Sequence, residues 1–374
     1  MHLTTALANP VAASADYSGA VSGVKGLYQI DPLSDQRWPE LVSRHSRASI
    51  FHSVPWLRAL RQTYGYQPIA FTWAATGGKL DGAALFCEVN SWLTGRRLVS
   101  LPFSDHCAVL LDQPSQSQEM LSILRSRLST DRFRYIEVRP TDSADMPSSD
   151  WVVSSTYTFH RLDLRPDLDV LFRNFHQSSI QRKILRAERE RLTYREGSDE
   201  ELLDAFYGLL TITRKRHCVP PQPRIWFCNL IENFGGALKI RVAFKGQRAV
   251  AGMLTIRHKN ALFYKYGGSD ARFHNLGGMH LLYWRAIQDA KRDGLGVLDF
   301  GRSDTNQPGL ITFKSRWGAT CSTLQYFRLA SHGNAVHSFD PASGMKRVAI
   351  KHLCSLAPAF LLPTCGRLLY KHIG

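Results

Sequence analysis

The chain repeats part of its sequence at a constant spacing, and this internal similarity constrains the fold more than any single motif. The segment WLRALRQTYG at 56–65 resembles WFCNLIENFG at 226–235. Four pairs match without a gap at an offset of 170 residues: Trp56 with Trp226, Leu60 with Leu230, Gly65 with Gly235, and Gly82 with Gly252. Four matches in one register indicate a duplicated structural unit.

The second copy has the clearer pattern of secondary structure. A helix ending at Gly235 precedes segments that alternate as an antiparallel meander, at 238–244, 248–259 and 261–268. Apolar residues at helical spacing then predict a helix over 279–290, followed by strands at 296–301 and 324–329. The first copy reads as a degenerate version, with strands at 95–103 and 132–139.

This order of elements resembles the acyltransferase core of the GNAT superfamily. We therefore predict an α/β (α+β) fold with two tandem lobes, each a mixed, mostly antiparallel sheet flanked by helices, and a cleft between them. The expected divisions are a disordered leader at 1–25, an N-terminal lobe at 26–160, a C-terminal acyltransferase lobe at 161–330 and a basic, apolar tail at 331–374.

Composition limits the classes of partner. The 374 residues carry a formal net charge of +16, which favours a polyanion such as RNA, anionic lipid or a phosphorylated carrier without choosing among them. Seven cysteines without a C-x-x-C pair predict neither a disulfide framework nor a metal site, and they favour a reducing cytoplasm. No run of about 18 apolar residues predicts a membrane-spanning helix.

The stretch DFGRSDTNQPGLITFKSRWG, 299–318, contains the DFG of protein kinases, but the other kinase motifs are missing. We instead predict that Asp299 ends a strand and that a polar loop from Arg302 leads to Lys314. Lys314 has two interpretations: a solvated lysine on a short amphipathic helix, or a cation that stabilises the leaving group of an acyl transfer.

Several segments resemble FemAB-like proteins, which are tandem-GNAT enzymes that add amino acids to peptidoglycan precursors. They are GLGVLDFGRSDTNQPGLITFKSRWGA, SSIQRKILRAERERL, TRKRHCVPPQP and LVSLPFSDH, and the resemblance covers most of 45–330. It is closest to the branch associated with exopolysaccharide and exosortase systems, with a BioF2-like acetyltransferase domain. Lys314 matches the lysine of the family motif F-K-x-x-[FW]-G, so the resemblance implies a catalytic lysine.

The resemblance implies transfer of an acyl or aminoacyl group to an amine of a cell-envelope or exopolysaccharide precursor, in the cytoplasm or at the inner face of the plasma membrane. The donor is aminoacyl-tRNA or acyl-CoA, and no tightly bound cofactor is expected. Two other functions remain open: an acetyl-CoA-dependent N-acetyltransferase acting on a small amine or sugar, and a non-catalytic anion-binding protein of envelope assembly. The oligomeric state is not indicated.

Candidate binding residues fall into two groups. A helix that Ser178 and Gln181 are predicted to open carries Arg182 and Arg186 on one face, either solvated or binding the phosphates of a nucleotide- or lipid-linked precursor. Gly277 and Gly278 stand where acetyl-CoA enzymes hold pyrophosphate, but the flanking residues depart from that pattern, so a tight turn is the alternative.

The remaining candidates lie on strands and loops. Asp105 follows a first-lobe strand and serves either as a base for the attacking amine or as a loop hydrogen-bond acceptor. Tyr264 and Tyr266 alternate along a strand, so we expect them on one face, in the core or against substrate; Arg302 is a further substrate-binding candidate. The tail has no acidic residue after Asp340 and either packs on the lobes or lies on an anionic membrane.

Overall fold

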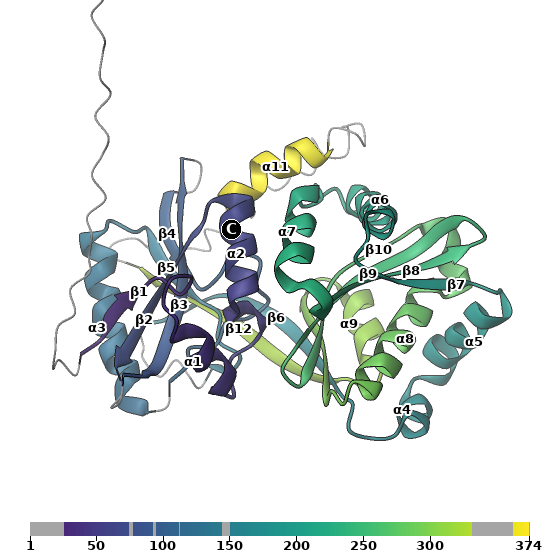
Figure 1. Ribbon diagram of the computed structural model, residues 1–374, viewed down its shortest axis with the longest axis horizontal. Coiled ribbons are helices and arrows are strands. Elements are labelled where there is room, and N and C mark those ends of the chain that lie inside the picture. Colours follow the sequence, from purple (N-terminus) through teal and green to yellow (C-terminus); the bar gives the residue numbers. More distant parts are fainter. Residues whose placement is uncertain are drawn as a thin grey trace, which may run out of the picture.

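The computed structural model describes residues 26–74, 78–92, 95–111, 113–143, 150–330 and 362–373. Their strands form one sheet of 12, in the order β1-β2-β3-β4-β5-β12-β6-β11-β10-β9-β8-β7. Figure 1 shows two lobes, with helices packed on each half of this sheet. The predicted α+β class with a mixed, mostly antiparallel sheet is confirmed.

The first lobe begins the sheet at its β1 edge. Its elements are β1 (Tyr28–Ile30), α1 (Trp38–Arg44), α2 (Val54–Tyr64), β2 (Gln67–Ala74), β3 (Leu80–Ser91), β4 (Gly95–Val99), α3 (Pro114–Thr130) and β5 (Tyr135–Val138). Strands β2, β3 and β4 form an antiparallel meander, and β5 lies parallel to β4 after the crossover helix α3.

The second lobe contains the longer elements. They are β6 (Val152–Asp163), α4 (Leu168–Asn174), α5 (Arg182–Arg189), β7 (Thr193–Gly197), α6 (Glu200–Arg216), α7 (Arg224–Phe234), β8 (Leu238–Lys245), β9 (Arg248–His258), β10 (Ala261–Ser269), α8 (Gly278–Arg292), β11 (Val297–Asp304), α9 (Pro308–Ser315) and β12 (Thr320–Ala330). Helix α11 (Leu362–Ile373) follows.

The two lobes contain the same unit. The order α2-β2-β3-β4-α3-β5 recurs as α7-β8-β9-β10-α8-β11, and in each case a helix connects the third strand to a parallel fourth strand. The first helices of the two units pack together, with the rings of Trp56 and Trp226 5.3 Å apart and nearly perpendicular. The repeat that predicted a duplication therefore corresponds to a structural repeat.

The two separate sheets expected from the sequence are joined into one. Strand β12 pairs with β6 from Thr320↔Arg161 onward and with β5 at Phe327↔Val138, so it carries the sheet from one lobe into the other. The division expected after residue 160 falls inside β6. Strands β12 and β6 lie between β5 and β11 and hydrogen-bond to them. The main-chain groups of β5 and β11 that would be unpaired at the edges of two isolated sheets therefore have partners.

The lobes also share a hydrophobic core. One cluster of buried side chains includes Leu57 and Leu60 of α2 together with Phe227 and Leu230 of α7. Because the lobes share this buried cluster and one continuous sheet, they are not separately folded domains on a flexible linker.

Helix α11 closes the top of this shared core (Figure 1). The Tyr66 hydroxyl donates to the Tyr370 carbonyl at 3.0 Å, and the Tyr370 hydroxyl donates to the Pro220 carbonyl at 2.9 Å. This part of the tail therefore packs on both lobes. The leader at 1–25 and residues 331–361 lie outside the described residues. None of the described helices is both long enough and apolar enough to cross a bilayer.

Candidate functional site

The candidate site lies where β10 and β11 separate. The two strands pair in parallel for three residues only, ending at Phe263↔Asp299, after which β10 continues beside β9 and β11 beside β6. Each strand has a bulge just past that point: Lys265 is the extra residue of β10, and Gly301, with φ +68°, lies in the bulge of β11. Bulges of this kind redirect side chains away from the regular alternation.

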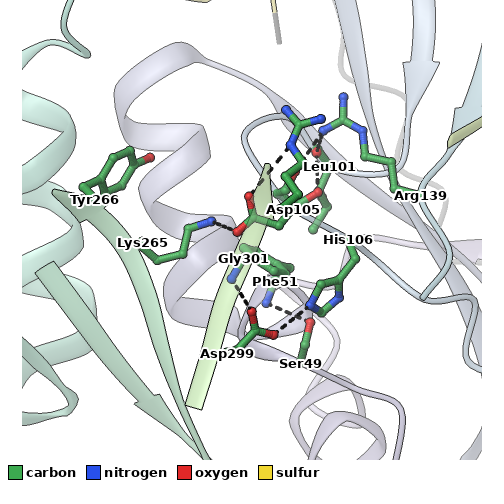
Figure 2. A network of polar contacts seen from close by, with 12 residues as sticks. Ser49, Phe51, Leu101, Asp105, His106, Arg139, Lys265, Tyr266, Asp299 and Gly301 are labelled. Carbon is green, nitrogen blue, oxygen red and sulfur yellow. Dashed lines mark hydrogen bonds and ion pairs between the residues drawn. The ribbon is translucent and has the colours of Figure 1, made fainter. Parts of the chain in front are cut away.

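Lys265 points across the lobe interface to Asp105, in the loop after β4. Its Nζ donates to Asp105 Oδ2 at 2.6 Å (Figure 2). Arg302 Nε lies 3.9 Å from Asp105 Oδ1. Burial acts to raise the pKa of the Asp105 carboxyl, but the two cations outweigh it and hold that pKa below its usual value. Asp105 is therefore an ionised carboxylate at neutral pH.

Asp299 ties the bulge to the first lobe. Its Oδ1 accepts the Gly301 amide at 2.7 Å, and its Oδ2 lies 3.4 Å from His106 Nε2. The prediction that Asp299 ends a strand is wrong, because β11 continues through the bulge to Asp304. The first residues of the predicted polar loop, Arg302 to Asp304, therefore belong to the strand, and helix α9 begins at Pro308. The His106 Nδ1 atom is buried without a hydrogen-bond partner.

Lys314 lies beneath the same bulge. Its side chain is 2% exposed, and Nζ donates to the carbonyls of Gly301 and Arg302, each at 3.0 Å. Burial lowers the pKa of Lys314 to about 8, with Asp105 and Asp299 opposing the shift. The interpretation of Lys314 as a solvated lysine is wrong, because the interrupted β6–β11 pairing leaves carbonyls at the bulge that accept from the ammonium in the interior.

Arg302 is the most accessible cation of the group. Its guanidinium stacks 4.0 Å from the Tyr157 ring centre and 5.0 Å from that of Tyr326, and the side chain is 32% exposed. The Nη1 atom is buried and has no hydrogen-bond partner, so a donor remains available beside Asp105. Sequence reasoning selected Lys314, Asp105 and Arg302, and the fold brings all three together.

An open depression of about 400 Å³ lies over α9, and Lys314 is not among the residues that line it. Its lining residues are Asn174, His176, Ile311, Thr312, Ser315, Arg316 and Gly318. The Ser315 hydroxyl oxygen lies 3.0 Å from His160 Nε2. Burial, with a smaller contribution from Lys314, lowers the pKa of His160 to about 4, so the imidazole is neutral at physiological pH.

The two strand tyrosines are placed differently from the prediction. Tyr266 packs in the core shared by the lobes and accepts a hydrogen bond from Trp226 Nε1 at 2.9 Å. Tyr264 packs in the other large core, where its ring centre lies 5.1 Å from that of Tyr283. The bulge at Lys265 puts them on opposite faces of β10, so the prediction of one shared face is wrong.

The other predicted binding residues form a second group where α5 meets α8. Arg182 is exposed, and Arg186 pairs with Glu190 at 3.6 Å. The main-chain oxygen of Lys183 lies 2.2 Å from the position a Cβ on Gly277 would take. Among the described residues no hydrogen bond or ion pair joins this group to Asp105, Arg302 or Lys314.

The start of α5 also differs from the prediction. The residues around Ser178 form a π-helical turn, Gln177–Gln181, and the α-helix begins at Arg182. The Gln181 side-chain amide donates to the carbonyls of Phe172 and Phe175, at the end of α4, instead of completing a capping box. The apolar residues Ile180, Ile184 and Ala187 are buried, so one face of this segment packs on the core.

Lys265 is the functional candidate that sequence reasoning missed. It lies 3% exposed between two tyrosines of an apolar strand, 4.5 Å from the centre of the Phe51 ring. A charged residue inside a strand of buried residues was the available signal, because lysine is buried only when it is paired.

The fold and this group of residues define the chain as an α+β protein with two copies of one α/β unit and a charged site at their junction. Residues 174–315 match the family model described as acetyltransferase (GNAT) domain, so this part of the chain is a GNAT domain. The match to this model suggests transferase activity. No curated protein matches the sequence.

Solved structures share the fold over most of the chain. FemX is 14% identical, with 82% of this chain and 97% of that one covered and a TM-score of 0.62. A tandem GNAT protein of the clavulanic acid biosynthesis pathway is 12% identical, covering 81% and 98% with a TM-score of 0.53. L-PGS from Bacillus licheniformis is 11% identical, covering 87% and 98% with a TM-score of 0.51. The tandem-GNAT fold therefore extends over both lobes.

Proposed function

We propose that this protein transfers an acyl or aminoacyl group to an amine of a cell-envelope or exopolysaccharide precursor. The observation that carries the proposal is the convergence of Asp105, Arg302 and Lys314, from both lobes, on the bulge where the two parallel strands of the GNAT domain separate. A site assembled from two lobes suits a reaction between two large substrates.

The reaction requires two bond changes and two proton transfers. The amine nitrogen attacks the carbonyl carbon of an ester or thioester, the new C–N bond forms, and the C–O or C–S bond breaks. The amine loses a proton, and the departing oxygen or sulfur gains one. Asp105, held as a carboxylate, orients the attacking amine and receives the proton that the nitrogen loses as the C–N bond forms. The unpartnered Nη1 of Arg302 donates to the negative carbonyl oxygen.

Lys314 serves the leaving group in this proposal. With a pKa of about 8 it is protonated at neutral pH, yet it is a stronger acid than an ordinary lysine. Two of its three N–H bonds go to main-chain carbonyls, which leaves one for the departing atom. Because the Lys314 side chain is buried, the departing oxygen or sulfur reaches Nζ only when the groups that cover Nζ in this structure move aside.

Two molecules remain candidates for the donor of the acyl group, aminoacyl-tRNA and acyl-CoA. The net charge of +16 fits aminoacyl-tRNA, which is a polyanion. The close approach of the Lys183 carbonyl accounts for the glycine at position 277, so no bound pyrophosphate is needed to explain it. Acyl-CoA stays as the alternative, since the tandem GNAT neighbour is described in relation to acetyl-CoA. We propose no tightly bound cofactor, and we place the reaction in the cytoplasm or at the inner face of the plasma membrane.

We assign Arg182 and Arg186 to the phosphates of a nucleotide- or lipid-linked precursor. Both arginines lie on the outer side of α5, and only Arg186 has an acidic partner, at 3.6 Å. The double variant Arg182→Glu/Arg186→Glu should weaken binding of uridine diphosphate in calorimetry, while the exposed control Lys215→Glu leaves it unchanged. Equal affinity for uridine diphosphate in both variants would show that Arg182 and Arg186 only form a solvated face of the helix.

The decisive experiment identifies the donor before measuring transfer. Native mass spectrometry of the purified protein tests for retained CoA, tRNA or lipid, and radiolabelled aminoacyl-tRNA and acetyl-CoA are then offered with amine acceptors. Lys314→Met should lower kcat by roughly 10² to 10³, the usual effect of removing one transition-state donor. The control Lys291→Met, whose lysine donates to the Arg165 carbonyl, should retain full activity.

The outcomes separate the proposal from its alternatives. Transfer from acetyl-CoA to small amines or sugars, with none from aminoacyl-tRNA, would identify an N-acetyltransferase instead. Binding of anions without transfer from either donor would identify a non-catalytic assembly protein. Full activity in Lys314→Met would remove this lysine from the chemistry.

A further inference from the structure

Helix α11 has two chemically different sides. Leu362, Gly366 and Tyr370 recur every four residues and are buried against the lobes. The exposed positions Thr364, Arg367, Leu368 and Lys371 follow i, i+3, i+4, i+7 spacing and therefore share the opposite side. Leu368 is 68% exposed and stands between two cations on that side.

The orientation of this helix is set by its anchors. Tyr66 donates from its hydroxyl to the carbonyls of Tyr370 and Lys371, at 3.0 and 3.1 Å, and Arg97 donates to the carbonyl of His372 at 3.0 Å. These bonds satisfy carbonyls at the end of the helix, which have no partner within it. The outward side is consequently held in place without any external partner.

Trp92 lies beside the last turn of α11. It follows β3, is 86% exposed, and its ring centre lies 5.9 Å from that of His372. Trp92 and Leu368 are the two most exposed large hydrophobic residues in the described part of the chain. We call Trp92, Arg367, Leu368 and Lys371 the α11 face.

We propose that the α11 face docks the protein on the surface of an anionic lipid bilayer. Tryptophan prefers the boundary between headgroups and acyl chains, and a leucine flanked by cations can insert while the cations remain among the phosphates. Charge complementarity favours a membrane over a protein groove, since the sequence contains no acidic residue after Asp340.

Docking in this orientation would involve the candidate site. The inner residue Tyr370 packs against Phe103, with ring centres 5.6 Å apart, and Phe103 precedes Asp105 by two positions in the same loop. A membrane contact on the outer side of α11 would thus lie above the loop that carries Asp105. The docking proposal does not depend on the proposed reaction, and it is tested without turnover.

The test is vesicle flotation of the full chain. Vesicles contain either phosphatidylcholine alone or phosphatidylcholine with 30 mol% phosphatidylglycerol, and binding is expected to the second kind. Arg367→Glu/Lys371→Glu should lower the partition coefficient at least about 25-fold, because each cation near an anionic leaflet contributes about fivefold. Trp92→Ser/Leu368→Ser should reduce binding at both low and high salt.

Matched controls exclude a general charge or hydrophobic effect. Arg189→Glu/Lys215→Glu makes the same change of charge at exposed positions on α5 and α6, and Leu185→Ser removes another exposed leucine. Both should bind like the original protein. Binding unchanged in the α11-face variants, or lost equally in the controls, would overturn the proposal. Self-association that Leu368→Ser abolishes, without vesicle binding, would overturn it too and assign the face to a second copy of the chain.

Discussion

Asp105 and Lys265 form a hydrogen-bonded ion pair, 2.6 Å long, between the loop after β4 and the bulge of β10. Lys265 is almost completely buried, beside the rings of Phe51 and Trp56. An ammonium in such a place is tolerated only while a carboxylate compensates its lost hydration. The pair therefore couples the geometry of the candidate site to the joining of the two lobes.

Removing one partner of this pair should destabilise the fold more than removing both. Asp105→Asn leaves the Lys265 ammonium buried without its carboxylate, and we expect a loss of about 3 kcal/mol in the free energy of unfolding. Asp105→Asn/Lys265→Met should recover most of it. Urea unfolding of the single and double variants measures the coupling. The control Asp163→Asn, in an exposed pair with Arg165, should cost less than about 1 kcal/mol.

The Lys314 amine should make stability depend on alkaline pH. Its folded-state pKa of about 8 lies below the unfolded value, so the folded protein binds fewer protons between about pH 8 and pH 10.5. Stability should consequently rise with pH across that window, relative to Lys314→Met, by up to roughly 3 kcal/mol. Urea unfolding from pH 7 to pH 10 tests this. Parallel curves for the two proteins would contradict the assigned pKa.

The charge on Lys314 should also be visible at His160. Burial is the main cause of the low pKa of His160, about 4, and the nearby Lys314 charge is the second cause. In Lys314→Met the pKa of His160 should rise while remaining below the ordinary value near 6.5, because burial persists. A histidine titration by NMR measures this shift. Lys291→Met is the control, and an unchanged pKa in Lys314→Met would place the two groups farther apart than the structure does.

Gly277 should be far less tolerant of a side chain than other glycines with positive φ. A Cβ at Gly277 would lie 2.2 Å from the Lys183 carbonyl oxygen, whereas at Gly246, with φ +60°, it would meet no atom within 4 Å. Gly246→Ala should cost about 1 to 2 kcal/mol through backbone strain alone. Gly277→Ala should cost several kcal/mol more in thermal unfolding. Equal costs would mean that α5 is not packed on the start of α8.

Three candidates selected from the sequence, Asp105, Arg302 and Lys314, lie together in the structure, but their arrangement differs from the one predicted. Asp105, Arg302 and Lys314 were recognisable because polar residues after apolar strands are uncommon in a core, and a motif resemblance added to Lys314. The two bulges were not recognisable, since a bulge depends on what the neighbouring strand offers at that point. For this reason Tyr264 and Tyr266 were placed on one face, and Lys265 was overlooked.

The amino-acid sequence by itself determined the repeated unit, because helix caps, turn glycines and apolar spacing act over about ten residues and recur at an offset of 170. It also determined the basic character of the chain and of α11. Only the tertiary structure decided that the lobes share one sheet and that Lys314 is buried under a bulge. It also decided that Lys265 meets Asp105 from 160 positions away. These features arise from strand pairing between distant segments, which local sequence patterns do not encode.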